Sequence, residues 1–232
     1  MGEGYHKERK PTIVVDGRVF LRIPVRTHVI MSNEDMAEIA WRYCKDLVQP
    51  DDIIFMSEKA TAASQGRAIP IDEIKPRPLA VYLAGKVKKV SYGIGLGSPE
   101  TMEMAIRECG TPRILLGAAV HAITRMFGRT GDFYRVAGMQ AALIDGAADY
   151  VIPPYNKYVT LGPKDPDAVA ARVATRLGVR ACVVDVNDVG GSWVIGSSAG
   201  VDRRLVERTL CDNPLGQSDE QTPIGIIREC RN

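Results

Sequence analysis

The chain is organised around Cys182-Val183-Val184-Asp185-Val186-Asn187-Asp188-Val189-Gly190-Gly191, which begins as an apolar strand and ends as a polar turn. The β-branched residues from Ala181 to Val184 predict a central strand. Asp185, Asn187 and Asp188 crowd the end of that strand, and carboxylate and amide oxygens are ligands that Mg²⁺ or Mn²⁺ accepts in proteins. Asp, Asn and Gly are also ordinary turn residues. The stretch therefore predicts either a divalent-metal site at a strand end or a strand followed by a polar turn.

Composition indicates an ordinary globular protein. The chain has 232 residues, of which 45% are hydrophobic and 25% charged, and its net charge is +2. Such a charge points to neither nucleic acid nor an anionic membrane as a partner. The longest apolar stretch, residues 114–127, is interrupted by His121 and Arg125 and is shorter than a membrane span of roughly 18 residues. The N-terminus lacks the apolar region of a signal peptide, so we expect a cytoplasmic protein.

The cysteines agree with that location. There are five, at scattered positions and without CxxC spacing. An odd, dispersed set is typical of reduced thiols and argues against a disulfide framework or a zinc site.

The sequence pattern predicts both strands and helices along the chain. Residues 1–18 are expected to form a polar tail and the start of a hairpin that turns at Asp16-Gly17, and residues 19–232 a single domain. Further strands are expected at 53–56, 139–144, 157–161, 179–186, 193–195 and 224–227. Helices are expected at 32–47, 79–88, 98–109, 114–126, 165–177 and 200–210. Ser32 is the expected N-cap of the first helix, and Ser98 with Pro99 begins the helix at 98–109. Of the neighbouring helices 98–109 and 114–126, the second is expected to be the more buried.

Two loops resemble phosphate-binding segments. Residues 57–67 are small, polar and glycine-containing and follow a strand, with Lys59 and Arg67 as charge partners for an anion. Residues 92–98 contain three glycines directly before a helix. Neither segment has the P-loop or Rossmann spacing, so a plain solvent loop is the alternative in each case.

Three polar turns lie beside predicted strands, around Asp145, Asp188 and Asp219. Each alone fits an ordinary turn. Together, the three would supply the oxygen ligands of one metal–phosphate site if the fold brings them to one place.

With these turns in view, the chain resembles the coenzyme F420-0:gamma-glutamyl ligase family over about residues 19–229. The resemblance is one of order and spacing. The segments that carry it, in chain order, are Arg22-Ile23-Pro24-Val25, Ser57 through Gly66-Arg67, Leu143-Ile144-Asp145-Gly146, Leu161 through Asp167, Val183 to Gly190, and Gly216 to Pro223.

The resemblance implies the fold of the family, which is an α+β architecture of mixed sheets with packed helices that forms an intertwined homodimer. It also implies a GTP-dependent ligase activity. Such an enzyme phosphorylates a substrate carboxylate with GTP bound to Mg²⁺ or Mn²⁺, and the amine of an amino acid then attacks the acyl phosphate to give a gamma-glutamyl or similar amide. The partners are therefore small-molecule carboxylates and amino acids. The resemblance assigns Pro24, Val25, Ser57, Lys59, Arg67 and Gln217 to the nucleotide, and Asp145, Asp188, Asp185 and Asn187 to the metal.

Several positions depart from the family pattern. The loop lysine of the family aligns with Ala63, and its Asp-Thr metal pair aligns with Asn187-Asp188. Ala147-Ala148 replaces a Ser-Asn pair, and the segment between Gly191 and Leu210 is shorter than in ligases that act on the deazaflavin coenzyme. Two alternative functions stay open: a non-catalytic nucleotide- or ligand-binding protein, and a metal-dependent phosphohydrolase in which water replaces the amine.

Overall fold

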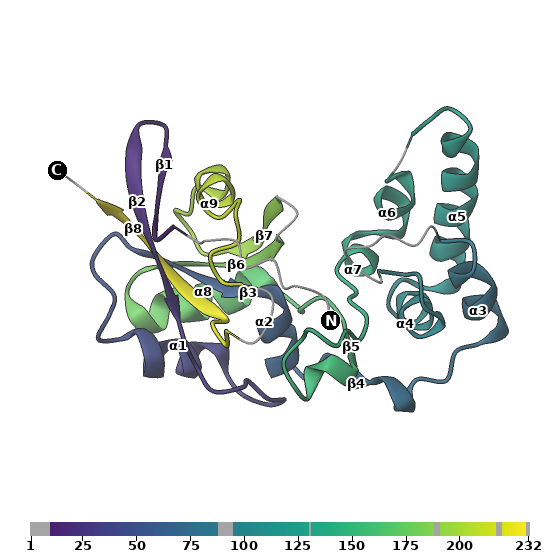
Figure 1. Cartoon of the computed structure of the whole chain (residues 1–232), viewed down its shortest axis with the longest axis horizontal. Helices are drawn as coiled ribbons and strands as arrows, with labels where there is room; N and C mark the ends of the chain where they lie inside the picture. Colours follow the sequence, from purple (N-terminus) through teal and green to yellow (C-terminus); the bar gives the residue numbers. More distant parts are fainter. Residues whose placement is uncertain (1–9, 88–94, 130, 188–190, 217–219, 231–232) are drawn as a thin grey trace. The chain divides into compact units, whose positions relative to one another are not determined.

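The structure is a computed structural model that describes residues 10–87, 95–129, 131–187, 191–216 and 220–230. The chain divides into two compact units. Unit 1 comprises Met1–Gln65 and Lys164–Asn232, and unit 2 comprises Gly66–Pro163. Helices and strands both contribute to the fold, which confirms the α+β class (Figure 1). The single domain expected over residues 19–232 stays a prediction.

Unit 1 is built on a six-stranded mixed sheet of order β1-β2-β8-β3-β6-β7. Strands β3 and β6 are parallel, and the other neighbours are antiparallel. The strands are β1 (Thr12–Val15), β2 (Arg18–Val25), β3 (Ile53–Ser57), β6 (Arg180–Asn187), β7 (Gly191–Ser197) and β8 (Ile224–Cys230). The helices are α1 (Met36–Cys44), α2 (Glu58–Ser64), α8 (Pro166–Leu177) and α9 (Arg203–Thr209).

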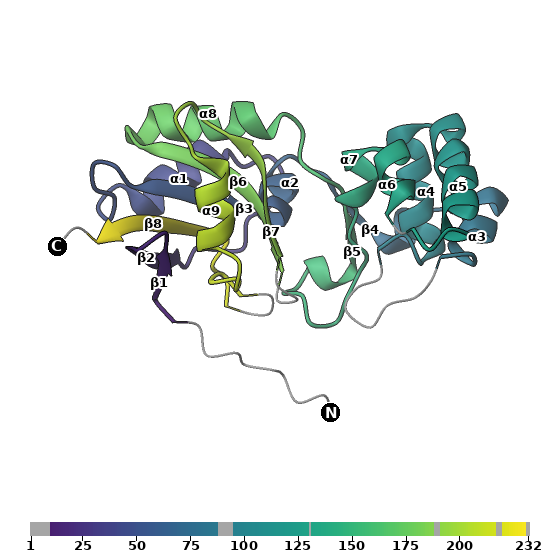
Figure 2. The ribbon, with the colours of Figure 1, turned by 90° about the horizontal axis from the view of Figure 1, so that it is seen from above.

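Helices cover both faces of this sheet. Figure 2 shows α1 and α8 along one face, and α8 contacts β6, β7 and α1. On the other face, Val206 and Leu210 join Phe55, Val184 and other side chains in one buried apolar cluster. The sheet is therefore the centre of a layered unit, and the apolar residues of its central strands β3, β6 and β8 are covered on both sides.

Local chemistry accounts for several of these elements. Asp16 and Gly17 have φ angles of 51° and 73°, as a two-residue hairpin turn requires, so the predicted turn is confirmed. Gly225 of β8 pairs with Phe55 of β3, and an added Cβ on Gly225 would lie 2.3 Å from the Phe55 ring. Only glycine allows the two strands to pair at this register.

Unit 2 is mainly helical. Its helices are α3 (Pro78–Ala84), α4 (Pro99–Cys109), α5 (Thr111–Arg125), α6 (Asp132–Ala137) and α7 (Met139–Ala142), with short 3₁₀ turns at Ile71–Glu73 and Tyr155–Lys157. The strands β4 (Ala68–Pro70) and β5 (Tyr158–Thr160) pair antiparallel. The predicted cap of α4 is confirmed, because the Ser98 hydroxyl accepts from the Thr101 N–H at 3.2 Å and Pro99 occupies the first turn.

Four expectations were wrong. Residues 57–67 are not a loop, because α2 fills 58–64 and buries Ala62 and Ala63. Residues 139–144 are not a strand, because α7 occupies 139–142. The N-cap of α1 is Asp35, whose carboxylate accepts from the Ala37 N–H at 2.9 Å, and not Ser32.

The fourth concerns α5, which was expected to be the more buried helix of its pair. Of its residues, only Ile114 and Gly117 are buried. Its remaining apolar side chains are partly or largely exposed, which shows that an apolar composition does not by itself place a helix inside a core.

All five cysteines are free thiols, as expected. Among the described residues, no helix has the length and apolar character to cross a membrane.

Candidate functional site

Three parallel strand ends define the candidate site in unit 1. Because β2 and β3 both run antiparallel to β8, and β3 runs parallel to β6, the carboxyl ends of β2, β3 and β6 lie at one edge of the sheet. Val25 and Met56 both pair with Ile224 at the start of β8, and Ser57 pairs with Val184. Ligands of open α/β sheets bind outside the carboxyl ends of strands, so this edge is the candidate ligand site of unit 1.

The end of β3 brings Ser57 to this edge. Its backbone N–H donates to the Pro223 carbonyl at 2.8 Å, and its own carbonyl accepts from the Thr61 hydroxyl at 2.8 Å. The Ser57 side chain makes no capping hydrogen bond to α2. Lys59 follows in the first turn of α2, exposed to solvent. The backbone of Ser57 is thus held on two sides.

The end of β6 brings Asp185 and Asn187 to the same edge. They pair with Trp193 and Gly191 of β7, and all of them except Trp193 are half-buried. An added Cβ on Gly191 would stand 3.1 Å from Asn187 Nδ2, so the glycine leaves room for this amide. Both side chains make further interactions within the protein. Carboxylate and amide oxygens that could bind a metal ion therefore lie at the same sheet edge as the end of β3.

The end of β2 lies against the segment that leads into β8. Pro24 is exposed and Val25 buried, and beyond Val25 the Thr27 N–H donates to the Gln221 carbonyl at 3.0 Å. Pro24 lies where β1 no longer pairs with β2, as its missing N–H favours. Pro24 and Val25 thus stand at the same sheet edge as Ser57, Asp185 and Asn187, although the sequence separates them widely.

Asp145 and Arg67 belong to unit 2. Asp145 exchanges two backbone hydrogen bonds of 2.9 Å with Thr160, an isolated bridge beside β5. The pKa of Tyr134 is raised, mainly by burial and further by the charge of Asp145. The carboxylate of Asp145 therefore acts on the phenol of Tyr134 within this unit.

Arg67 is buried, and its guanidinium is engaged inside unit 2. Nε donates to the Gly162 carbonyl at 2.5 Å, and Nη2 donates to Glu108 at 2.6 Å. The backbone carbonyl of Arg67 accepts from the Leu161 N–H at 2.9 Å. Its observed contacts join the strands that enter and leave unit 2, and its assignment to a phosphate stays a prediction.

Asp188 and Gln217 lie outside the described residues, as does Asp219. Within the described ranges, no group of three His, Cys, Asp or Glu side chains could hold a metal ion. The sequence-predicted metal residues thus separate into Asp185 and Asn187 in unit 1 and Asp145 in unit 2.

Glu58 is a residue that the sequence argument missed. It follows β3 directly, is only 4% exposed, and begins α2. Buried carboxylates are uncommon, so each has a structural or chemical reason. The sequence feature that could have indicated this residue is a glutamate directly after the apolar strand Ile53–Ser57. The expected loop over residues 57–67 instead placed Glu58 in solvent.

The edge thus offers hydroxyl, carboxylate and amide oxygens from two parallel strand ends, with an exposed lysine nearby. Such a set suits a hard cation and a phosphorylated ligand. A family model described as F420-0:Gamma-glutamyl ligase matches residues 24–199 of the chain. A search against curated proteins finds no match.

Proposed function

The chain belongs to the F420-0:gamma-glutamyl ligase family, and we propose that it is a GTP- and divalent-metal-dependent enzyme that forms a gamma-glutamyl or similar amide bond. The family is one of ligases, which supports an enzyme that acts on small molecules. The observation that carries the proposal is the meeting of Pro24, Ser57 and Asp185 at one sheet edge of unit 1.

The donor set at this edge fits a hard divalent cation. Asp185 and Asn187 offer oxygen atoms, and among the described residues no thiolate or imidazole competes with them there. Mg²⁺ is commonly held by one or two carboxylates together with substrate phosphates, so a protein cage of three acids is not required. We assign Asp185, Asn187 and Asp188 to the metal ions at this edge. Asp145 of unit 2 is the further metal residue that the family resemblance assigns. When bound, the ions neutralise the charge that develops on the transferred phosphoryl group.

The remaining residues position the nucleotide. Ser57 and Lys59 supply a hydroxyl and an ammonium group to the phosphates, Pro24 and Val25 supply apolar surface, and Arg67 and Gln217 are the further candidates.

The substrate carboxylate oxygen attacks the γ-phosphorus, and GDP leaves. The amine of the amino acid then attacks the acyl carbon, phosphate leaves with the former carboxylate oxygen, and the nitrogen loses one proton. The net products are the amide, GDP and phosphate.

The first test is a calorimetric titration with GTP and with ATP, each with and without Mn²⁺. We expect metal-dependent GTP binding that weakens at least about tenfold in Asp185→Asn, because a charged metal ligand becomes neutral. Asp46→Asn changes an exposed carboxylate that is not at the edge and serves as the matched control. Equal GTP binding by Asp185→Asn and wild type would show that Asp185 does not serve the metal.

Turnover separates the two alternatives. A ligase releases phosphate from GTP only when a carboxylate and an amine are both present, and the product carries the new amide. Phosphate release from GTP alone would indicate a phosphohydrolase. Nucleotide binding without release under any acceptor would indicate a binding protein, which is the function that the alanine at position 63 favours.

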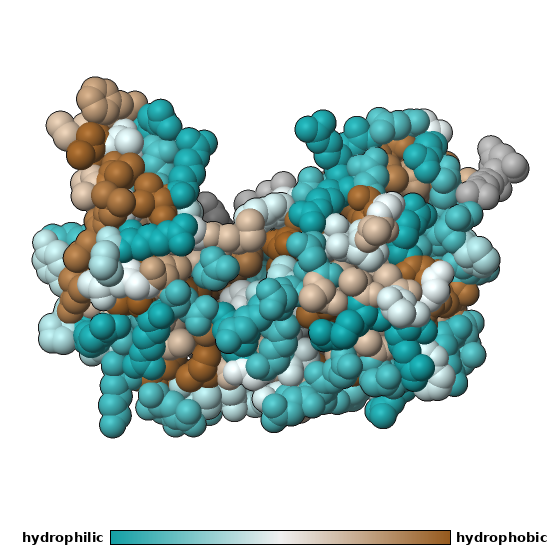
Figure 3. Space-filling view, turned by 180° about the vertical axis from the view of Figure 1, so that it is seen from behind, coloured by the Kyte–Doolittle hydropathy of each residue, from teal (hydrophilic) through white to brown (hydrophobic). Residues whose placement is uncertain are grey.

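We further propose that the chain forms a homodimer through α5. The helix carries a stripe of exposed apolar residues at the spacing of one helical face. The stripe consists of Leu115, Leu116, Ala119, Ala122, Ile123 and Met126, with Phe127 beyond the end of the helix. Figure 3 shows hydrophobic surface gathered over this part of unit 2.

A second copy of the chain is the occupant that the stripe fits. Leu116 and Ile123 are each 59% exposed, and Met126 is 82% exposed. The large side chains together present on the order of 500 Å², which forms the core of an interface of about 800 Å² per partner. The small residues Ala119 and Ala122 lie between the larger ones. Two antiparallel copies of α5 would thus meet at the alanines, with Leu115 and Leu116 of each copy opposite Ile123 and Met126 of the other.

A further inference from the structure

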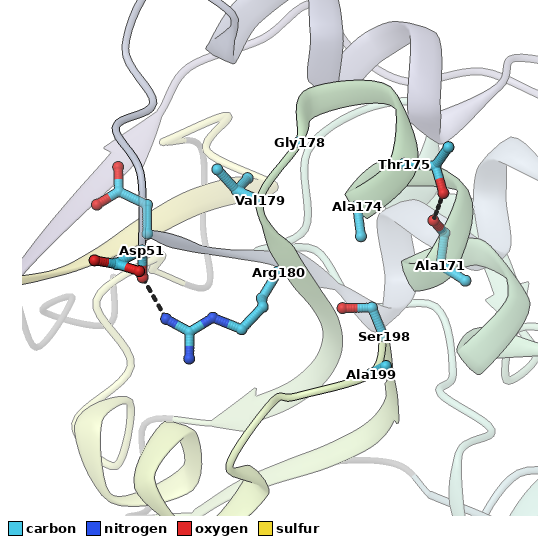
Figure 4. Close-up of a pocket in the computed structure, with 10 residues that line it drawn as sticks. Asp51, Ala171, Ala174, Thr175, Gly178, Val179, Arg180, Ser198 and Ala199 are labelled. Carbon is cyan, nitrogen blue, oxygen red and sulfur yellow. Dashed lines mark hydrogen bonds between the residues drawn. The ribbon is translucent and has the colours of Figure 1, made fainter.

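Unit 1 contains a cavity of about 500 Å³ at the opposite edge of the sheet from the candidate site. It lies at the amino ends of β3 and β6 and at the carboxyl end of α8 (Figure 4). Its lining is formed by Asp51, Asp52, Ala171, Ala174, Thr175, Gly178, Val179, Arg180, Ser198 and Ala199. Small side chains line the α8 side, and polar groups stand around them.

Arg180 offers hydrogen-bond donors to this cavity. Its Nη2 donates to the Asp51 carbonyl at 2.5 Å, and within the described chain its Nε and Nη1 have no further partner. This hydrogen bond to the backbone of Asp51 positions the Arg180 guanidinium at the cavity. A positioned guanidinium with free N–H groups is suited to a carboxylate.

Ser198 adds a second donor. The residue is 8% exposed, and its Oγ accepts from the Ala181 N–H at 3.0 Å. In the described part of the chain, the hydroxyl proton has no acceptor. Figure 4 shows the hydroxyl directed toward the side of the cavity where Arg180 stands.

The other side of the cavity attracts positive charge. The last carbonyl groups of α8, near Thr175 and Gly178, have no donor within the helix and carry the negative end of its dipole. Asp51 contributes a carboxylate to the same lining. Asp52 also lines the cavity, and both of its oxygens accept from Arg228, at 3.0 and 2.7 Å.

We propose that this cavity binds a free α-amino acid as a zwitterion. Arg180 and the Ser198 hydroxyl take the carboxylate, and the carbonyl end of α8 with Asp51 takes the ammonium group. A ligand with only one of the two charges satisfies only one side of the cavity and leaves the other without its counter-charge.

The cavity is a separate site from the proposed ligase centre. β6 runs from Arg180 at the cavity to Asn187 at the candidate site, about 23 Å for a strand of this length. The inference therefore does not depend on the proposed ligase activity, and the two can fail independently.

The test is a titration of the ¹⁵N-labelled full chain with L-alanine, acetate and ethylammonium, each to roughly 50 mM, followed by amide chemical shifts. We expect alanine to shift the amides of Arg180, Ala181 and Ser198, with acetate and ethylammonium at least about tenfold weaker. Arg180→Gln should lose at least about tenfold in alanine affinity and keep GTP binding. Arg204→Gln removes an exposed arginine outside the cavity and should behave as wild type.

Arg180→Lys keeps the charge but not the fork of donors, so it should bind alanine with intermediate affinity, and it replaces Arg180→Gln if that variant does not fold. Absence of shifts at these amides would overturn the proposal. Equal affinity for acetate and alanine would replace the zwitterion by a simple anion. Undiminished alanine binding in both Arg180 variants would place the ligand elsewhere.

Discussion

The longest helix of each unit meets its surroundings differently. α8 in unit 1 buries Val169, Ala170 and Val173 against the sheet and exposes Arg172 and Arg176. α5 in unit 2 buries Ile114 and Gly117 and exposes a second apolar face. The first pattern belongs to a helix that covers one layer. The second is the pattern expected of a helix that lies between two apolar surfaces, of which the core of unit 2 provides one.

The difference teaches how each unit is stabilised. Unit 1 has a sheet with apolar side chains on both faces and helices to cover them, so its stability comes from its own core. Unit 2 packs side chains of α3, α4, α5 and α7 into one apolar cluster and leaves apolar surface outside it. Its stability is then expected to depend on what covers α5.

The largest expected effect is in the core of unit 1. Phe55 is fully buried beneath Gly225, so Phe55→Ala should lower the free energy of unfolding by about 3–5 kcal/mol. Leu116→Ala, on the exposed face of α5, should cost at most about 0.5 kcal/mol in dilute, monomeric protein. Chemical denaturation measures both. Equal losses would remove the contrast between the two units.

Next is the oligomeric state. Ile123→Glu puts a charge in the centre of the α5 stripe and should convert a dimer to a monomer, because a buried carboxylate without a partner is strongly unfavourable. Sedimentation equilibrium measures the mass. Leu47→Glu, at a similarly exposed leucine of unit 1, is the control and should leave the dimer intact. A wild-type chain that sediments as a monomer would refute the α5 interface.

A smaller effect concerns acid stability in unit 2. Burial raises the pKa of Glu103, but hydrogen bonds from Arg77 and Arg107 outweigh it and hold the pKa below the ordinary 4.5. A carboxyl group with a depressed pKa stabilises the fold above its unfolded pKa, and this contribution is lost as the pH falls from about 4.5 through the lower folded value.

Glu103→Gln should therefore lower stability by about 1.5–3 kcal/mol at pH 7 and flatten its decline below pH 4.5. Far-UV circular dichroism follows this transition. Glu73→Gln, at an exposed glutamate of unit 2, should keep the wild-type acid profile. The same acid profile for Glu103→Gln and wild type would mean that Glu103 does not contribute.

The smallest effect is a difference in thiol reactivity. Burial raises the pKa of Cys44 and Cys182, both in unit 1, to about 12, whereas Cys109 of unit 2 is half-buried with a pKa raised by burial. At pH 8 we expect fast alkylation of Cys211 and Cys230, slower alkylation of Cys109, and the slowest at Cys44 and Cys182. Mass spectrometry resolves the sites. Modification of Cys182 as fast as Cys109 would indicate that unit 1 opens as readily as unit 2.

Elements specified by nearby residues were predictable. The Asp16-Gly17 turn, the Ser98-Pro99 helix start and the strand that contains Cys182 to Val186 are all present. Their signals are positive φ, a side-chain cap and a β-branched run, which act over a few residues. The family resemblance was readable for the same reason, since it depends on the order of short motifs along the chain.

Other features depended on contacts distant in the sequence. Residues 57–67 contain small residues that suit a loop or a helix, and burial of Ala62 and Ala63 in unit 1 selected the helix. The apolar residues of α5 suited a core position, but the remainder of unit 2 covers only one of its faces.

The sequence by itself therefore determined the α+β class, the main strands of unit 1, the cap of α4 and the family. The tertiary structure alone decided that the ends of β2, β3 and β6 meet at one edge, and that Arg180 and Ser198 line a cavity at the other. Strand order and register depend on which apolar faces pack together across long separations in the chain. No local pattern of residues carries that information.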